Sequence, residues 1–401
     1  MPVFFFFLYL LLLIQPVFAL SPLQLYIEIT PPGGVLNLDP GYYSGPAVIK
    51  QPITINGHGR VTIDAGGDGS VLTIEADNTT IRGLHLTHSG TSFDKIDAAI
   101  SLKADNALIE NNIIDHTLFG IQLQGADKNI IRNNKITSIN TSVSLRGDGL
   151  RMWYSHDNLI ENNDFSKVRD IYVTNSLRNR FIANHISHSR IGFELVFSHN
   201  NTLTANSIKH NTTGFMIVYS SDLLINDNYV SHLRSFAGSA MAFKESHNIK
   251  ILDNTILHCS IGFSTNSPLD PQNNLLIKSN HFLYNDVALY FYGEKGGHLI
   301  YDNFFEVNLL DVQASLPRAS FYNDWQNNHW DLYEGFDRNH DGIGDTAYEL
   351  YAWSDRLWVD VPMTQFFRGT PILETIDFME RFASFSKPAI MLHDQNPGLK
   401  K

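Results

Sequence analysis

The chain has 401 residues, of which 43% are hydrophobic and 17% are charged, and its formal net charge is -12 at pH 7. This length allows two ordinary domains or one elongated repeat domain with appendages. The acidic balance argues against a nucleic-acid partner, because binding a phosphate backbone needs stripes of lysine and arginine. Cys259 is the only cysteine, so an intramolecular disulfide is impossible and a cysteine-based zinc site is not expected.

The N-terminus carries an unbroken apolar run over residues 3–14, followed by small residues at Val17 and Ala19. This order predicts a secretory signal peptide over residues 1–19, cleaved after Ala19, although no lysine or arginine precedes the run. An uncleaved membrane anchor is the alternative. The run of about 12 residues is short for a ~20-residue membrane span, so we expect an exported chain.

An asparagine then recurs about every 24 residues in the pattern apolar-x-x-Asn-x-apolar, and such a period indicates a solenoid. The recurrent asparagines are Asn112, Asn134, Asn163, Asn184, Asn206, Asn228, Asn254, Asn280, Asn303 and Asn328. Between them lie short runs of alternating apolar and polar residues, which are typical of strands. Strands this short bury both faces only if successive coils stack in parallel. The pattern predicts an all-β, right-handed parallel β-helix with rungs of ~22–26 residues about 4.8 Å apart, and an inward asparagine ladder.

We expect residues 20–319 to form this β-helix, with residues 20–55 covering the first rung. Uncovered ends of a solenoid would aggregate. Residues 320–401 are expected to close the last rung and then leave the repeat as a cap, an Asp-rich loop and a helix.

One set of strands is expected to present its middle side chains to solvent. These residues are Gln122, Arg151, Tyr172, Glu194, Met216, Ala242 and Tyr290. The stripe holds one carboxylate and no pair, which argues against the acid/base chemistry of a polysaccharide lyase or hydrolase. A secreted polysaccharide-active enzyme and a structural or adhesive solenoid stay open as alternatives, and Asp148, Asp170 and Glu194 stay open as members of a site.

Histidine stands four positions after the ladder asparagine in four consecutive repeats, at His188, His210, His232 and His258. Lys167 occupies the same column one repeat earlier, which places the column at a rim. Imidazoles stacked at ~4.8 Å cannot all be charged. Two neutral ring nitrogens about 4 Å apart would suit a linear Cu(I) ion. A column that only packs ring against ring is the alternative.

Three methionines, Met152, Met216 and Met241, offer softer ligands near this column. Thioether sulfur together with imidazole would select copper over zinc or magnesium. The histidines and methionines together are therefore the candidate copper ligands.

Residues 327–345 resemble the front half of a calcium loop, with Gly342 for a tight turn. The candidate calcium ligands are Asp337, Asn339, Asp341 and Asp345. Tyr348 stands where a calcium loop has its final glutamate, so a turn-rich end cap is the alternative.

Residues 370–388 have the apolar spacing of an amphipathic helix outside the coil. The apolar residues are Ile372, Leu373, Ile376, Phe378, Met379, Phe382 and Phe385. Pro371 and Pro388 bound the segment as a detached unit, which favours docking on a partner over folding back as a cap.

Five segments make the chain resemble the NosD family, the periplasmic β-helix proteins of nitrous oxide reductase maturation. They are RGDGLRMWYSHDN (146–158), RDIYV (169–173), HSRIGFELVFSHN (188–200), TGFMIVYSSD (213–222) and GFDRNHDGIGDTAY (335–348). The resemblance covers nearly all of the mature chain. One departure is that Val196 and Val218 stand where the family pattern has methionine, so a copper site built from those thioethers would be lost or moved.

The resemblance implies a non-enzymatic periplasmic role beside an ABC transporter made of an ATPase and a membrane subunit. It implies that a copper chaperone lipoprotein delivers Cu(I) to this assembly. ATP hydrolysis would then support loading of the copper centre of nitrous oxide reductase. By the same resemblance, the C-terminal helix would dock on the periplasmic side of the transporter.

Overall fold

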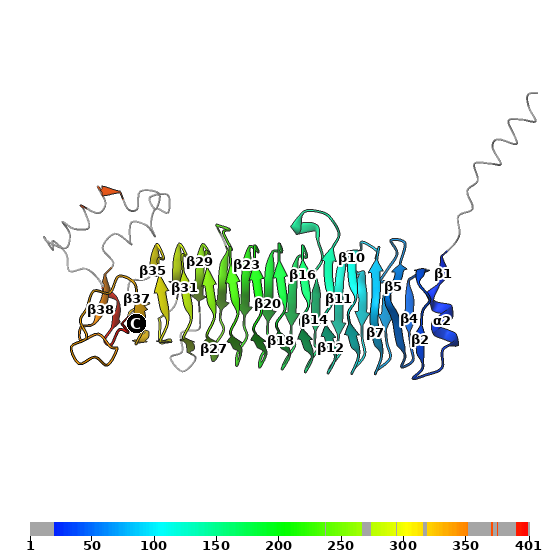
Figure 1. Ribbon diagram of the computed structural model, residues 1–401, viewed down its shortest axis with the longest axis horizontal. Helices are drawn as coiled ribbons and strands as arrows, with labels where there is room; N and C mark the ends of the chain where they lie inside the picture. Colours follow the sequence, from blue (N-terminus) through cyan, green and yellow to red (C-terminus); the bar gives the residue numbers. More distant parts are fainter. Residues whose placement is uncertain are drawn as a thin grey trace, which may run out of the picture.

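The structure, a computed structural model, describes residues 20–399 except 237, 267–273, 294, 316–318, 352–369, 372–374 and 376–389. The described chain forms one long parallel β-helix that runs the length of the molecule (Figure 1). Within those residues, no helix is long and apolar enough to cross a membrane. The expected signal peptide at residues 1–19 lies outside the described part.

Each coil of the helix contributes one strand to a 12-stranded sheet and two strands to a 25-stranded sheet. The strands of the 12-stranded sheet are β4 (Ala47–Ile49), β6 (Leu72–Ile74), β8 (Ala98–Leu102), β11 (Phe119–Gln124), β14 (Leu150–Trp153), β17 (Asp170–Thr174), β20 (Ile191–Val196), β23 (Thr213–Val218), β26 (Ser239–Lys244), β29 (Ile261–Asn266), β32 (Val287–Phe291) and β35 (Leu310–Ala314). All its pairings are parallel and follow chain order from coil to coil.

The two strands that each coil adds to the larger sheet follow one another along the chain. The first of each pair are β9 (Leu108–Glu110), β12 (Ile130–Arg132), β15 (Leu159–Glu161), β18 (Arg180–Ile182), β21 (Thr202–Thr204), β24 (Leu224–Asn226), β27 (Ile249–Leu252), β30 (Leu275–Lys278), β33 (Leu299–Tyr301) and β36 (Asp324–Gln326). The second are β10 (Ile113–Thr117), β13 (Lys135–Ser138), β16 (Asp164–Ser166), β19 (His185–Ser187), β22 (Ser207–Lys209), β25 (Tyr229–Ser231), β28 (Thr255–Leu257), β31 (His281–Leu283), β34 (Phe304–Glu306) and β37 (His329–Trp330). The long strands β5 (Thr54–Asp64) and β7 (Thr80–Thr87) span both positions in the first coils.

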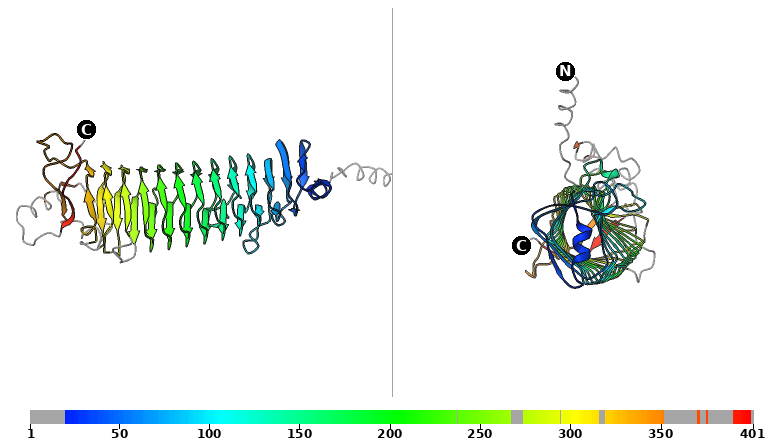
Figure 2. Two further views of the ribbon diagram at one scale, coloured as in Figure 1. Left: turned by 90° about the horizontal axis from the view of Figure 1, so that it is seen from below. Right: turned by 90° about the vertical axis from the view of Figure 1, so that its right-hand side faces the viewer.

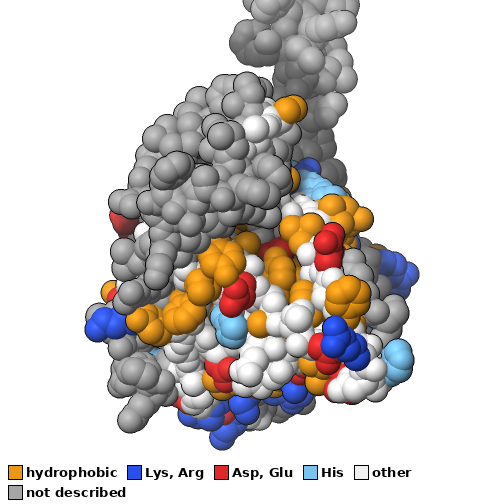
Figure 3. All heavy atoms as spheres, turned by 90° about the vertical axis from the view of Figure 1, so that its left-hand side faces the viewer, with side chains coloured by type: hydrophobic (Ala, Val, Ile, Leu, Met, Phe, Trp, Pro, Cys, Tyr) orange, Lys and Arg blue, Asp and Glu red, His pale blue; other side chains and the backbone are white. Residues whose placement is uncertain are grey.

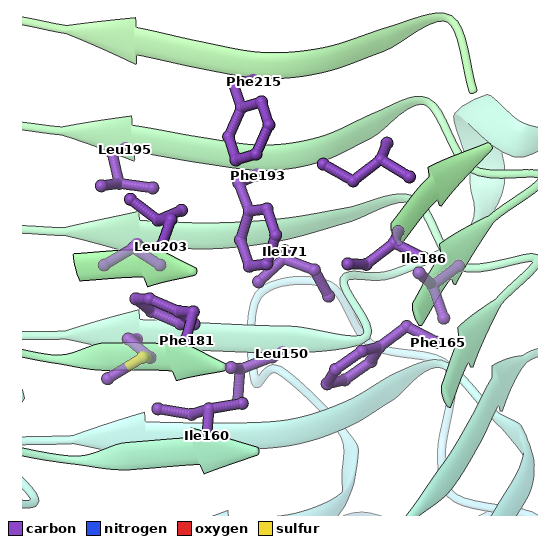
Figure 4. Close-up of a cluster of buried hydrophobic side chains, with 14 of the residues drawn as sticks. Leu150, Ile160, Phe165, Ile171, Phe181, Ile186, Phe193, Leu195, Leu203 and Phe215 are labelled. Carbon is purple, nitrogen blue, oxygen red and sulfur yellow. The ribbon is translucent and has the colours of Figure 1, made fainter. Parts of the chain in front are cut away.

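The core is the inside of this tube, because alternation along each strand sends every second side chain inward. Aliphatic and aromatic residues therefore lie above one another in columns (Figure 4). Phe193 stacks on Phe215 with ring centroids 5.5 Å apart, and Phe181 meets Phe193 edge-on at 5.3 Å. Burial of these columns stabilises each coil only through its neighbours, which is why the coils form one continuous stack.

The predicted asparagine ladder is confirmed. All ten ladder asparagines are buried, and each side-chain amide donates to the side-chain oxygen of the next one at 2.9–3.1 Å. A second ladder at another turn was not predicted. There the Asn158 side chain donates to Asn179 at 3.0 Å, and backbone N–H groups continue the series through Asn129 and Asn201.

Both ends of the tube are covered. The short strand β1 (Ser21–Pro22) leads into helix α2 (Leu23–Ile29), which lies across the N-terminal opening (Figure 2) and buries Leu23 and Ile27. Strands β2 (Val35–Asn37) and β3 (Gly41–Ser44) then pair with β5 to start the coil. Residues 20–55 thus form the first coil and its cover.

The coil continues beyond residue 319, since β36 and β37 still pair in parallel with β33 and β34. It is closed by the antiparallel pair β38 (Tyr348–Tyr351) and β39 (Ile390–Asp394). Asp394 ends the ladder by accepting hydrogen bonds at 3.1 Å from the backbone and side-chain amides of Asn328. Apolar side chains lie on the surface of this end among acidic ones (Figure 3), and Leu332 is 72% exposed.

Candidate functional site: the histidine column and its charged support

The predicted histidine column lies on the outside of one edge of the tube. His188, His210, His232 and His258 each occupy the turn between the second strand of the larger sheet and the strand of the smaller sheet; we call these turns the histidine corner. All four are exposed and all have positive φ angles between 54° and 61°. Histidine is among the non-glycine residues enriched in this left-handed conformation. The corner geometry therefore repeats the same outward aim in each coil.

The four imidazoles form a continuous stack. Neighbouring ring centroids are 5.3, 5.1 and 5.3 Å apart, with tilts of 30°, 41° and 47°. Tyr284 extends the stack by one coil at 5.1 Å from His258. Partial burial and the neighbouring rings of His210 and His258 lower the pKa of His232, so the middle of the column is neutral at neutral pH and its nitrogens are free to bind a metal.

A second, shorter stack belongs to the same corner nearer the N-terminus, where His88 and His116 lie 5.5 Å apart. It differs because carboxylates hold both rings: His88 contacts Asp64 at 2.9 Å and His116 contacts Asp115 at 3.1 Å. The four-histidine column has no such contact among the ion pairs of the described residues. Its rings are therefore the ones whose nitrogens are not committed to acids.

Neighbouring imidazoles in this column can offer at most a two-coordinate site. Among the described residues, no group of three His, Cys, Asp or Glu side chains is arranged to hold a metal ion. Cys259 follows the column directly, but it is buried and burial raises the pKa of its thiol to about 12. It stays a thiol at neutral pH, and thiolate is the form that binds metals.

The structure separates two of the three candidate methionines from the column, which corrects the expected ligand set. Met152 and Met241 are fully buried inside the tube, because they follow the outward-facing residues Arg151 and Ala240–Ala242 stripe in the alternating pattern. Met216 is half-buried on the outer face of the smaller sheet, paired with Glu194. A buried core thioether cannot reach an ion on the corner.

An arginine–aspartate network lies beside the column, at the start of β14, β17 and β20. Its members are Asp148, Arg151, Arg169, Asp170, Arg190 and Glu194. Buried Asp148 contacts Arg169 and Arg151, each at 2.9 Å. Buried Asp170 accepts hydrogen bonds from two nitrogens of Arg190. The network reaches the column through the chain itself, since Arg190 follows His188 by two residues.

Burial shapes the charges in this network. It raises the pKa of Asp148 in spite of the charge of Arg169. Burial and the charge of Asp170 raise the pKa of Glu194, while the hydrogen bond to Asp170 raises the pKa of Arg190. Two of the three acids are fully buried and committed to arginines, so only Glu194 faces solvent. The network is built to fix the turns, with ion pairs taking the place of a packed corner.

Sequence reasoning placed Asp148, Asp170 and Glu194 singly and missed that they form one network with three arginines. The signal was present in the repeated arginine just before or after each acid, in Arg146–Asp148, Arg169–Asp170 and Arg190–Glu194. The expected outward stripe itself is confirmed, because Gln122, Arg151, Tyr172, Glu194 and Met216 occupy paired positions in successive strands.

The Asp-rich loop is folded on itself. Asp337 accepts hydrogen bonds from the backbone of Asp341 at 3.2 Å and of Gly342 at 2.9 Å, and Asp345 accepts one from the backbone of Arg338 at 2.8 Å. These carboxylates cap backbone N–H groups within the loop. The described residues hold no cluster of three acids or histidines fit for a metal, so the calcium expectation gains no support.

The expected partner-docking residues fall outside the described residues. They are Ile372, Leu373, Ile376, Phe378, Met379 and Phe382. The docking segment therefore stays a prediction.

A family model described as periplasmic copper-binding protein (NosD) matches residues 137–335, and a model of the right-handed β-helix region matches residues 61–171. Two proteins named probable ABC transporter binding protein NosD are similar over most of their length. The one from Pseudomonas aeruginosa is 29% identical over 372 residues, covering 87% of this chain and 84% of the relative. The one from Stutzerimonas stutzeri is 28% identical over 400 residues, covering 90% and 86%. The chain belongs to the NosD family.

The NosD match spans the whole four-histidine column and the arginine–aspartate network, because both lie between residues 137 and 335. The predicted right-handed parallel β-helix is confirmed by the fold and by the family model. The family description also confirms the coarser expectation of a periplasmic, copper-binding family, whose relatives are named as binding proteins of an ABC transporter.

Solved structures share the fold of this NosD-family chain but little of its sequence. The surface adhesin PfbA of Streptococcus pneumoniae has a TM-score of 0.56 at 11% identity and covers 73% of this chain and 87% of its own. A family 28 exopolygalacturonase of Yersinia enterocolitica has a TM-score of 0.56 at 9% identity and covers 73% of each chain. An adhesin and an enzyme on one scaffold show that the β-helix alone does not set the function.

Proposed function

We propose that this chain is a periplasmic accessory protein of a copper-processing ABC transporter complex and serves the assembly of the copper centre of nitrous oxide reductase. Its partners are the transporter's ATPase and membrane subunits, a copper chaperone lipoprotein and the reductase. The family description and the names of the relatives support a copper-binding role beside a transporter. The observation that carries the proposal is the exposed four-histidine column within the matched region.

The column suits Cu(I) as a transient cargo. Imidazole nitrogen binds copper well, and Cu(I) accepts low coordination numbers that a pair of stacked rings can supply. His232 is held neutral by its neighbours, so it needs no proton loss before it binds. Because no third ligand stands ready among the described side chains, a partner can complete the coordination or withdraw the ion. Weak, incomplete coordination is what a relay site requires.

The arginine–aspartate network supports this site by fixing the turns that carry the column. Arg146 donates to the backbone carbonyl of His188 at 3.3 Å, and Arg190 is locked onto Asp170 two residues later. The first ring of the column is thus held from both sides. The role we assign to the network is positioning.

The test is an anaerobic titration of the mature chain, residues 20–401, with Cu(I) against a competing chelator. The variant changes His188, His210, His232 and His258 to asparagine. Asparagine tolerates the positive φ that all four positions have, so the turns are kept while the imidazoles are removed. We expect Cu(I) binding in the parent chain and its loss in the variant.

The matched control changes His199 and His247, which lie in a different corner of the tube, to asparagine. Loss of binding in the control as well, or undiminished binding in the four-histidine variant, would remove the column from the proposal. Unchanged thermal unfolding of both variants is the check that the β-helix is intact.

A further inference from the structure

The histidine corner is also the place where positive charge collects on this acidic protein. Three consecutive turns of the corner, residues 166–169, 187–190 and 209–213, lie between two longer loops, residues 139–147 and 232–238. We call this surface the saddle. These five segments contain no aspartate or glutamate, although the chain has 41 acidic against 29 basic residues. The basic character is therefore local and sorted.

Part of this positive charge is not neutralised. Arg169 and Arg190 are paired with the buried aspartates, and Arg234 is paired with Asp286 at 2.9 Å. Lys167 is exposed, and no carboxylate of the described residues pairs with it. The same holds for Lys209, whose ammonium lies 4.9 Å from the ring centroid of Tyr229.

A third cation of the saddle is satisfied only by backbone. Arg146 donates to the carbonyl oxygens of Thr141 at 3.0 Å and of His188 at 3.3 Å, and no acid among the described residues pairs with it. Arg146, Lys167 and Lys209 thus leave a field of positive charge that this chain does not cancel. A negatively charged group on a partner would gain from all three.

Apolar side chains mark both ends of the saddle. Leu145 is 57% exposed on the 3₁₀ turn η1 (Val143–Leu145), and Phe236 is 93% exposed on the other loop. The second loop is anchored, because Leu233 is fully buried and Arg234 holds Asp286. An aromatic ring exposed to this extent on an anchored loop is typical of an interaction site. Both loops stand above the turns between them (Figure 1).

The two loops are four coils apart, which is about 19 Å at ~4.8 Å per coil. A helix of about 13 residues, at ~1.5 Å per residue, spans the same distance. We propose that the saddle docks an acidic segment of a partner protein that carries an apolar residue near each end. Its carboxylates meet Arg146, Lys167 and Lys209, and its apolar residues meet Leu145 and Phe236.

The shape favours a protein segment over a lipid surface. A flat bilayer would touch the tips of the loops, whereas the three cations lie in and beside the lower turns between them. The inference goes beyond the copper proposal and does not rest on it, because lysines and apolar side chains carry it and no imidazole does. Its test accordingly contains no metal.

The probe is a fluorescein-labelled helical peptide of about 14 residues, with four glutamates in the middle and a leucine at each end. Fluorescence anisotropy measures its binding to residues 20–401 at low salt, against the same peptide with lysines in place of the glutamates. The variants are Lys167→Glu with Lys209→Glu, and Phe236→Ser. The controls are Lys250→Glu, an exposed lysine on the larger sheet, and Tyr42→Ser, an exposed aromatic residue near the N-terminus.

We expect the acidic peptide to bind, the lysine peptide not to bind, and each saddle variant to weaken binding roughly tenfold. The controls are expected to bind like the parent chain. Equal binding of both peptides, or an equal effect of the controls, overturns the proposal.

Two other occupants are tested with the same variants. Co-sedimentation with vesicles of anionic phospholipid that the saddle variants abolish, without peptide binding, would assign the saddle to a membrane and overturn the proposal. A dimer in sedimentation velocity that the saddle variants dissolve, again without peptide binding, would assign it to a second copy of the chain. Each side chain changed is at the surface, so unfolding is not expected, and circular dichroism checks this.

Discussion

Single residues in this protein are chosen by the backbone geometry that repeats in every coil. The ladder positions take asparagine because its amide donates and accepts along one line, so the same side chain satisfies the coil before and the coil after. The corner positions take histidine, asparagine or aspartate because these residues tolerate positive φ. Asp394 takes the ladder position after Asn328 with a carboxylate, which only accepts, and no further coil is needed beyond it.

Asp394→Asn is expected to stabilise the protein at neutral pH. Burial raises the pKa of Asp394 above its ordinary value of 3.8, and this exceeds the opposing effect of its hydrogen bonds to Asn328 and Trp330. The charged form therefore lowers the free energy of unfolding at pH values above the folded-state pKa. Asparagine keeps an accepting oxygen without the charge.

Denaturant unfolding of the Asp394→Asn variant and the parent, at pH 7 and near pH 4, checks this sign. Because the folded-state pKa is raised, the parent regains stability as the pH falls through that pKa towards 3.8, so the advantage of the variant is expected to shrink at low pH. An advantage that grows on acidification would contradict the assignment.

Among the elements, the strands and their order were predictable from the sequence, and the contacts of the corner loops were not. The asparagine period fixed the register of the coil, and with it the histidine column and the outward stripe. The same alternation that places Arg151 outside already places Met152 inside, so the buried methionine was available to sequence reasoning. The pairing of Arg169 with Asp148 and the second asparagine ladder depend on how far each corner loop folds back, which no short pattern encodes.

Strand β39 is expected to be essential for closing the coil. A chain ending at residue 389 loses Asp394, which leaves the amides of Asn328 without their acceptor and costs about 2–3 kcal/mol. It also uncovers the last coil, and an open strand edge is a site for association. Concentration-dependent association in sedimentation velocity is the expected result, and Asp394→Asn in the full chain, which keeps β39, is the control that should stay monodisperse. A monodisperse truncated chain would show that β39 is dispensable.

For the whole molecule, the same strand separates two roles that the sequence had combined in residues 320–401. Residues 390–394 belong to the closure of the β-helix, while residues 370–388 carry the predicted docking segment. A deletion from residue 370 to the end would remove both, so loss of a complex would not report on docking.

Substitution of Phe378 and Phe382 by aspartate is the sharper test of the docking segment, because it leaves β39 in place. We expect the variant to fold and to lose at least tenfold in affinity for the solubilised ATPase and membrane subunits, as removal of two apolar anchors from an interface would cause. The measurement is a binding titration against the purified transporter. Replacement of Leu332 and Phe336, which are exposed on the closing loops, is the matched control; retained affinity in the Phe378 variant would exclude the segment from docking.

The asparagine ladder also gives the molecule an electrical direction. Every side-chain amide points its N–H towards the following coil, so the small dipoles add head to tail along the axis, as peptide dipoles do in an α-helix. The positive pole of this array falls at the C-terminal end. A carboxylate is the group that such a pole attracts, and Asp394 stands there. The tube is thus polarised along its length, and its two ends differ in field as well as in sequence.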